Sequence, residues 1–200
     1  NAHNNLAAVY IAQAIENPSR ASELGNKAKA QLDIAAKIND AGEVHANLAS
    51  THMLLGNAYA AYNHAVKALG KRLATDDSRG VNGVKGAAEI VKAKYADAVS
   101  STSSATANAD NLFNKGLAQI LNKDYQNAVT SLNEATAKNG NLAIAFYAAA
   151  VAHARLGNAD NVVSSLTSAV KVDPALKAAA LSDLEFSKYF ANEAFRNALK

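Results

Sequence analysis

The feature that most constrains this chain is a segment layout that occurs twice, 34 residues apart. Gly116 and Ala150 occupy the same place in the two copies, each inside an apolar pattern with helical spacing. Polar turns at residues 122–125 and 156–158 separate each of these patterns from a second helical pattern. A unit of this length cannot bury its apolar faces alone and must stack on its neighbours. The sequence therefore predicts an array of stacked helix pairs.

The composition supports an all-α fold. Half of the residues are apolar, alanine dominates, and the chain has no Trp and only two Pro. Alanine has the highest helix propensity, and its short side chain lets helices approach closely. The long β-branched runs of a buried parallel sheet are missing. We expect thin, closely spaced helical layers.

Charge and cysteine usage exclude several kinds of partner and chemistry. The net charge is +3, and the densest basic group, Lys67, Lys71 and Arg72, ends a helix where cations suit the helix dipole. A nucleic-acid partner is therefore not expected. The absence of cysteine rules out disulfides, Cys-ligated zinc and thiol catalysis. No stretch approaches the ~20 apolar residues of a membrane span, so the chain is not expected to span a membrane.

The two regular copies resemble tetratricopeptide repeats (TPRs), whose signature of small and large apolar positions extends over 34 residues. Gly116 and Ala150 match the Gly position of the first helix. The matching positions of the second helix are Ala128 and Val162, then Leu132 and Leu166, then Ala135 and Ala169, and Pro174 matches the final Pro. The resemblance implies a right-handed α-solenoid of antiparallel helix pairs. It implies binding of a protein or peptide, without catalysis or a cofactor.

Three looser copies precede the regular ones, so we expect about five repeats in a single helical repeat domain covering residues 1–200. The expected divergent repeats are 1–38, 42–70 and 79–104, the regular ones are 109–142 and 143–176, and residues 177–200 form a C-terminal cap. Irregular spacing makes the stretch from Leu69 to Asp110 the place where the stack is expected to bend or to lose register.

Both ends of the chain carry a prediction. Asp183 to Phe186, followed by Phe190 and Phe195, resembles the tail that follows the last TPR and covers its exposed face. Asn1 opens in the middle of a helical pattern without a matching cap. We expect the natural protein to continue upstream with further repeats.

The residues that could carry chemistry are interpreted as structural. His3 and His45 occupy the Trp position of the repeat and His52 and His153 the Tyr position, which predicts packing in preference to a metal site. Gly80, Gly83 and Gly86 do not form a dinucleotide motif and are interpreted as a flexible helix start. Neither a catalytic serine motif nor a pair of carboxylates stands out, so no enzyme, metal or cofactor is predicted.

In TPR proteins the first helices line a concave binding surface. The residues that the resemblance implies for that surface are Asn5, Ala8, Glu43, Asn47, Ser50, Asn114, Leu117, Tyr147, Val151 and Arg155. Asparagine amides can both donate to and accept from a peptide backbone. A solvated polar face without a ligand is the alternative for each of these residues.

We therefore expect an interaction scaffold that binds a protein or peptide of unknown identity, at a bacterial cell envelope or in the periplasm, with a cytoplasmic location left open. The alternative is a helical-repeat module that binds a glycan or another small ligand. That function needs clustered aromatic platforms, for which Tyr59, Tyr62, Phe146 and Tyr147 are the candidates. The sequence does not indicate the oligomeric state.

Overall fold

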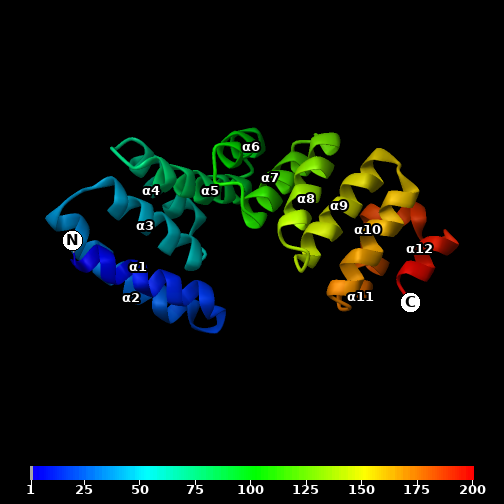
Figure 1. Ribbon diagram of the computed structural model, residues 1–200, viewed down its shortest axis with the longest axis horizontal. Coiled ribbons are helices and arrows are strands. Elements are labelled where there is room, and N and C mark those ends of the chain that lie inside the picture. Colours follow the sequence, from blue (N-terminus) through cyan, green and yellow to red (C-terminus); the bar gives the residue numbers. More distant parts are fainter. Residues whose placement is uncertain (1) are drawn as a thin grey trace. The chain divides into compact units, whose positions relative to one another are not determined.

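The computed structural model describes residues 2–200, which form twelve α-helices and two 3-10 helices without any strand (Figure 1). The expected all-α class is confirmed. The helices are α1 (Ala2–Glu16), α2 (Ala21–Ile38), α3 (Gly42–Leu54), α4 (Ala58–Leu69), α5 (Thr75–Val91), α6 (Tyr95–Ser103), α7 (Ala109–Leu121), α8 (Tyr125–Lys138), α9 (Ala143–Leu156), α10 (Ala159–Val172), α11 (Leu176–Ser182) and α12 (Glu193–Ala198), with the 3-10 helices η1 (Pro18–Arg20) and η2 (Leu184–Tyr189).

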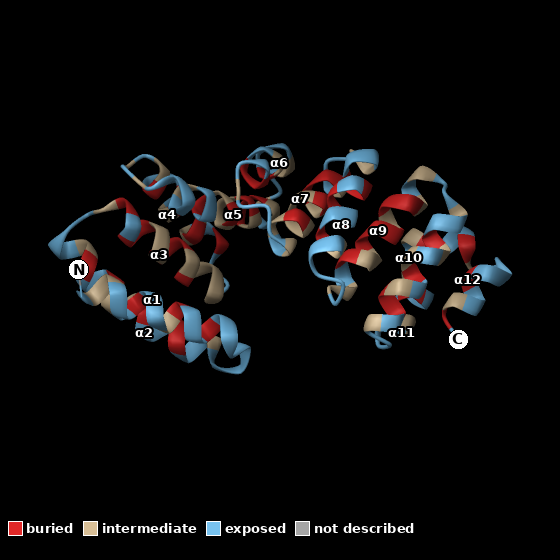
Figure 2. Cartoon of the chain, in the orientation of Figure 1, coloured by how far each residue is buried: buried red, intermediate tan, exposed pale blue. Residues whose placement is uncertain are grey.

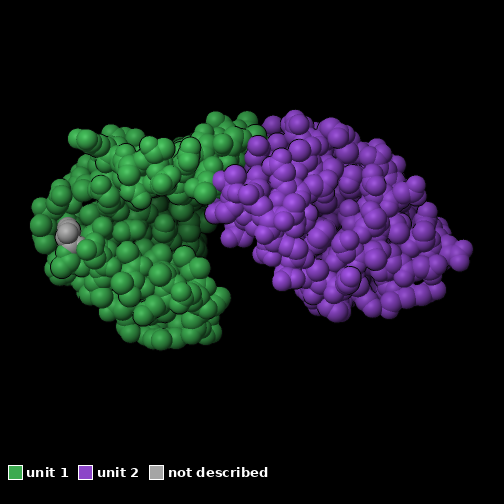
Figure 3. Space-filling model, in the orientation of Figure 1, with its two compact units in different colours: residues 1–106 green, residues 107–200 purple. Residues whose placement is uncertain are grey.

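The chain divides into two compact units, residues 1–106 and residues 107–200 (Figure 3). Unit 1 contains α1 to α6, and unit 2 contains α7 to α12. The boundary between them falls inside the stretch from Leu69 to Asp110, where the irregular spacing predicted a change of register.

Consecutive helices pack as pairs. In unit 1 these pairs are α1 with α2, α3 with α4 and α5 with α6, and in unit 2 they are α7 with α8 and α9 with α10. We call the first member of each pair the A helix and the second the B helix. The A helices also contact one another within a unit: α3 lies against both α1 and α5, and α7 lies against α9. Each unit is thus a stack of helix pairs.

Small residues allow the two helices of a pair to approach closely. The buried residues form stripes along the helices (Figure 2), and alanines such as Ala28, Ala61 and Ala128 in these stripes have no exposed surface. A Cβ atom added at Gly116 would lie 2.5 Å from Leu132 Cγ, so this glycine is needed for contact between α7 and α8. The second-helix positions that matched the repeat signature are all buried: Ala128, Leu132, Ala135, Val162, Leu166 and Ala169.

The three glycines interpreted as a flexible helix start lie inside α5, so that interpretation is wrong. The helix begins at Thr75, and Gly83 and Gly86 are buried. A Cβ atom at Gly86 would lie 2.5 Å from Thr102 Cγ2 of α6. Gly86 is therefore the close-contact residue of its helix pair, as Gly116 is in the next pair.

Within residues 2–200, four of the five A–B turns share one backbone conformation, and the connection between α1 and α2 is formed by η1 instead. Gly56 and Gly157 have φ angles of 72° and 77°, in the left-handed region that glycine adopts easily. Ala93 and Lys123 stand at the same place in the two other turns, with φ angles of 55° and 64°. The turn geometry is thus kept where the sequence offers no glycine, at a cost of roughly 1–2 kcal/mol for a residue with a Cβ atom.

The C-terminal residues close unit 2. α11 and α12 contact α10, and η2 contacts α9. Phe186 and Phe195 have no exposed surface and form an aromatic cluster with Tyr189 and Phe190. This cluster continues the apolar core that α9 and α10 begin.

Replacing Lys123 by glycine should stabilise the protein. The substitution relieves the left-handed strain but increases the entropy of the unfolded chain, so we expect a gain of about 0.5–1 kcal/mol. Thermal unfolding checks this, since 1 kcal/mol corresponds to roughly 2–4 °C in a chain of this size. The matched variant Gly157→Ala should shift the melting temperature downwards. Equal shifts of the same sign in the two variants would contradict a left-handed strain at position 123 that glycine relieves.

Candidate binding surfaces on the A helices

In unit 1, the predicted site residues lie on α1 and α3, which contact each other directly. Asn47 Nδ2 of α3 donates a hydrogen bond of 3.0 Å to Asn4 Oδ1 of α1. Asn5 and Glu43 are exposed, while Ser50 is half-buried and its hydroxyl donates to the Ala46 carbonyl over 3.3 Å. Within residues 2–200, the remaining amide atoms of Asn47 and Asn4 make no hydrogen bond, which leaves a donor and an acceptor for a backbone.

In unit 2, Asn114 and Leu117 lie half-buried on α7. The Asn114 amide has no hydrogen-bond partner within the described chain. An amide group beside an apolar side chain on one helix face can bind both the backbone and a side chain of a peptide.

The three predicted site residues of α9 already contact the C-terminal segment of the same chain. The Tyr147 hydroxyl donates a hydrogen bond of 2.8 Å to Asp183 Oδ2, and its ring meets Phe186 edge-on, with centroids 5.6 Å apart. Arg155 Nε donates to Glu185 Oε2 over 2.5 Å, and the second guanidinium nitrogen pairs with Glu185 Oε1. Val151 packs against the aromatic cluster.

These contacts change the protonation behaviour of both residues. Burial raises the pKa of Tyr147, and the hydrogen bond to Asp183 raises it further. The hydrogen bonds to Glu185 raise the pKa of Arg155. Sequence reasoning did not foresee that residues 183–186 lie on this face. The usable signal was the alternation of acidic and apolar side chains in that segment, which complements Arg155 and Tyr147.

Histidines form a stack between α3 and α4. His45 Nδ1 and His64 Nδ1 lie 2.9 Å apart, and the ring of His52 stacks on His64 with centroids 5.3 Å apart. His45 is buried, and its Nε2 contacts Asp40 Oδ1 over 2.5 Å. In this contact one Nδ1 donates the hydrogen and the other accepts it. The histidines pack as the sequence predicted.

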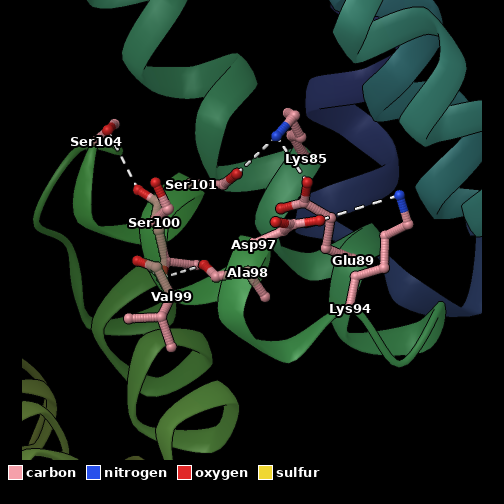
Figure 4. A network of polar contacts seen from close by, with 10 residues as sticks. Lys85, Glu89, Lys94, Asp97, Ala98, Val99, Ser100, Ser101 and Ser104 are labelled. Atoms are coloured by element: carbon pink, nitrogen blue, oxygen red, sulfur yellow. Dashed lines mark hydrogen bonds and ion pairs between the residues drawn. The ribbon is translucent and has the colours of Figure 1, made fainter. Parts of the chain in front are cut away.

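An ion pair is buried between α5 and α6 (Figure 4). Lys85 Nζ lies 2.7 Å from Glu89 Oε1 and 2.9 Å from Ser101 Oγ, and Glu89 is only 1% exposed. A Ser–Lys pair can serve nucleophilic catalysis only when the lysine is neutral. Here Lys85 is also paired with Glu89, and Ser101 is buried. We assign the network to the packing of α5 on α6.

Polar side chains occupy the position where the repeat signature has Tyr. Glu89, Gln119 and His153 are buried there, and each has one side-chain atom without a hydrogen bond: Oε2, Oε1 and Nδ1 respectively. Burial lowers the pKa of His153, because it disfavours the charged imidazolium. These three side chains belong to the packing of the helices, and each keeps one buried polar atom without a hydrogen bond within residues 2–200.

The aromatic candidates for a glycan platform lie in both units, Tyr59 and Tyr62 on α4 and Phe146 and Tyr147 on α9. Tyr59 is 64% exposed, but the Lys92 ammonium lies over its ring at 3.6 Å from the centroid. Tyr147 faces the C-terminal segment, and Phe146 lines a different pocket of about 480 Å³ beside Gly140 and Lys171. Within residues 2–200, no three His, Asp or Glu side chains are placed to hold a metal ion, and no helix is long and apolar enough to cross a membrane.

The histidine stack should make stability depend on pH. Burial lowers the pKa of His64 to about 4, and the neighbouring His45, His52 and Lys67 lower it further, against a smaller opposite effect of Asp33. The unfolded chain, with a histidine pKa of about 6.5, binds more protons between these values. The contribution of neutral His64 to the free energy of unfolding is therefore fully present above pH ~6.5, and it decreases as the pH falls towards ~4. Because His64 is only half-buried, we expect a loss of about 1–2 kcal/mol.

Urea unfolding at about pH 7.5 and pH 5 measures this loss. The variant His64→Asn keeps a hydrogen-bonding group near the Nδ1 position and does not titrate, so its two curves should lie closer together. If wild type and variant showed the same pH dependence, the origin of the effect would lie elsewhere.

Comparison with known proteins identifies the fold. No protein-family model and no curated protein sequence matches the chain. Among solved structures, it resembles MamA, with a TM-score of 0.67 and 18% identity over 80% of this chain and 94% of that one. It also resembles YrrB, solved as a TPR protein with an unusual peptide-binding site, with a TM-score of 0.67 and 18% identity over 84% and 88% of the two chains.

A thermophilic TPR protein from Thermus thermophilus superposes with a TM-score of 0.61 and 18% identity, over 96% of this chain and 98% of that one. At such low identity the likeness shows the fold alone. It agrees with the helix pairs, the small residues between them and the matching second-helix positions. The chain therefore has the tetratricopeptide repeat fold.

Proposed function

We propose that this protein is a non-catalytic scaffold that binds a segment of another protein on the faces of its A helices. The sites are the Asn4–Asn47 pair with Asn5, Glu43 and Ser50 on α1 and α3, and Asn114 with Leu117 on α7. The fold is one that protein-interaction scaffolds use, and the solved structure of YrrB has a peptide-binding site.

The contact between α9 and residues 183–186 is the observation that carries this proposal. A short segment without α-helical structure lies on an A-helix face, where its side chains contact Tyr147 and Arg155. Its acidic groups meet Tyr147 and Arg155, and its Phe186 side chain is buried. This intramolecular contact supports the proposal that an A-helix face binds a peptide segment.

The contacts of the aromatic residues support a peptide over a glycan. A sugar ring stacks on an open aromatic face, whereas the ring of Tyr59 has an ammonium group over it and Tyr147 faces Phe186. We keep glycan binding as the competing outcome of the experiment below. A location at the bacterial cell envelope is part of the proposal.

Peptides selected from a phage-displayed library on the folded protein test the proposal. Asn47→Glu and Asn114→Glu place a charge on the A-helix faces of units 1 and 2, and one or both should weaken binding of the selected peptides at least about tenfold, a loss of roughly 1.4 kcal/mol. The matched controls Asn63→Glu and Gln126→Glu change exposed positions on the B helices α4 and α8 and should bind normally.

Thermal melts of all four variants should be close to the wild-type melt, because the substituted side chains lie outside the core. Equal loss of binding in the A-helix and B-helix variants would contradict the assignment of the surface. Selection of no peptide, together with a positive result on a glycan array, would favour the alternative function.

A further inference from the structure

A cluster of lysines and tyrosines lies at the start of α4, beside the turn between α5 and α6. Tyr59 and Tyr62 are in the first turns of α4, Lys92 ends α5, Lys94 precedes α6, and Lys85 lies on α5. We call these five residues the lysine–tyrosine cluster. None of them belongs to the A-helix faces discussed above.

The three ammonium groups lie close to one aromatic ring. The Nζ atoms of Lys92, Lys94 and Lys85 are 5.0, 5.2 and 5.8 Å from the centroid of Tyr62. Lys92 Nζ is also 3.6 Å from the centroid of Tyr59. Cation–π contacts attract ammonium groups to the rings but leave their charge in place. The cluster therefore concentrates positive charge and restricts the motion of the Lys92 side chain.

Within the described chain, the nearby carboxylates pair with Lys85 and, at longer distance, with Lys94, and they leave Lys92 unpaired. Glu89 is buried and pairs with Lys85 at 2.7 Å, whereas Asp97 lies 4.0 Å from Lys94 and both of these side chains are largely exposed (Figure 4). Exposed pairs at that distance contribute little. Within residues 2–200, Lys92 has no carboxylate within ion-pair distance. Its positive charge is held in place and remains available to a ligand.

The cluster also offers polar and apolar contacts beside the charge. Tyr59 is the most exposed aromatic side chain of the cluster, at 64%. The hydroxyl groups of Tyr59 and Tyr62 form no hydrogen bond within the described chain, so both can donate to an incoming carboxylate. An acidic segment complements the surface: its carboxylates face Lys92 and Lys94 and accept hydrogen bonds from the tyrosine hydroxyls.

We propose that the lysine–tyrosine cluster is a second binding site, which takes an acidic segment of a partner protein. A single-stranded nucleic acid is the less suitable ligand. Its bases stack on open aromatic faces along an extended basic groove. Here an ammonium group lies over the Tyr59 ring, and the adjoining first turn of α6 carries Asp97.

Fluorescence anisotropy with the labelled peptide Glu-Glu-Leu-Leu-Glu-Glu tests this site. The measurement uses the whole chain at an ionic strength of about 0.15 M, where exposed charges more than ~8 Å apart are screened. Wild type should bind this probe at least about tenfold more tightly than the same peptide with Gln in place of every Glu. An oligothymidine of equal length should bind more weakly than the acidic peptide.

Two variants, each of which removes one positive charge, distinguish a specific site from general electrostatic attraction. Lys92→Ala should weaken binding of the acidic peptide about tenfold. Lys37→Ala, at an exposed position of α2, should change it less than about twofold. Lys92→Gln keeps most of the length of the side chain and should behave like Lys92→Ala. Tyr59→Leu should weaken binding because Lys92 loses its ring contact.

Equal effects of Lys92→Ala and Lys37→Ala would overturn the proposal, since the attraction would then be non-specific. Tighter binding of the oligothymidine than of the acidic peptide would also overturn it. The Asn47→Glu and Asn114→Glu variants should bind the acidic peptide normally, so this site can fail or succeed independently of the A-helix faces.

Discussion

The close approach of each A helix to its B helix is the contact on which the rest of the structure depends. Where the helices cross, the residues are alanine or glycine. Ala28 and Ala61 have no exposed surface, and the Leu132 side chain fills the space beside Gly116. This close packing brings backbones into van der Waals contact and turns the larger side chains towards the next pair. Within each unit, neighbouring A helices then come together and present a shared face.

Much of this arrangement could be predicted from the sequence. The apolar spacing around Gly116 and Ala150 reports burial directly, so the second-helix positions of both regular repeats were placed correctly. The turns were harder. Gly56 and Gly157 indicate a left-handed residue, but Ala93 and Lys123 adopt the same conformation without any sign in their residue types. Only their alignment with the glycine-containing turns reveals it, because the stacking of the helices imposes the turn geometry.

The candidate sites were less predictable, because they depend on which segments meet in space. The repeat resemblance places Asn47 on the expected binding face of α3, but the bond to Asn4 of α1 requires the stacking of two helix pairs. The pairing of Arg155 with Glu185 joins residues whose meeting depends on how the chain turns after α10. The lysine–tyrosine cluster likewise combines α4 with the end of α5 and the start of α6. By contrast, Lys85 and Glu89 are four residues apart on one helix, a spacing visible in the sequence.

The C-terminal segment on α9 has a consequence for selectivity. Because residues 183–186 are covalently attached, they compete with any outside ligand for Tyr147 and Arg155 at an effective concentration of the order of millimolar. If the A helices bind partner segments as proposed, a foreign peptide must displace residues 183–186 before it can reach Tyr147 and Arg155. Tethering would then set an affinity threshold on this face of unit 2, which weak ligands do not reach.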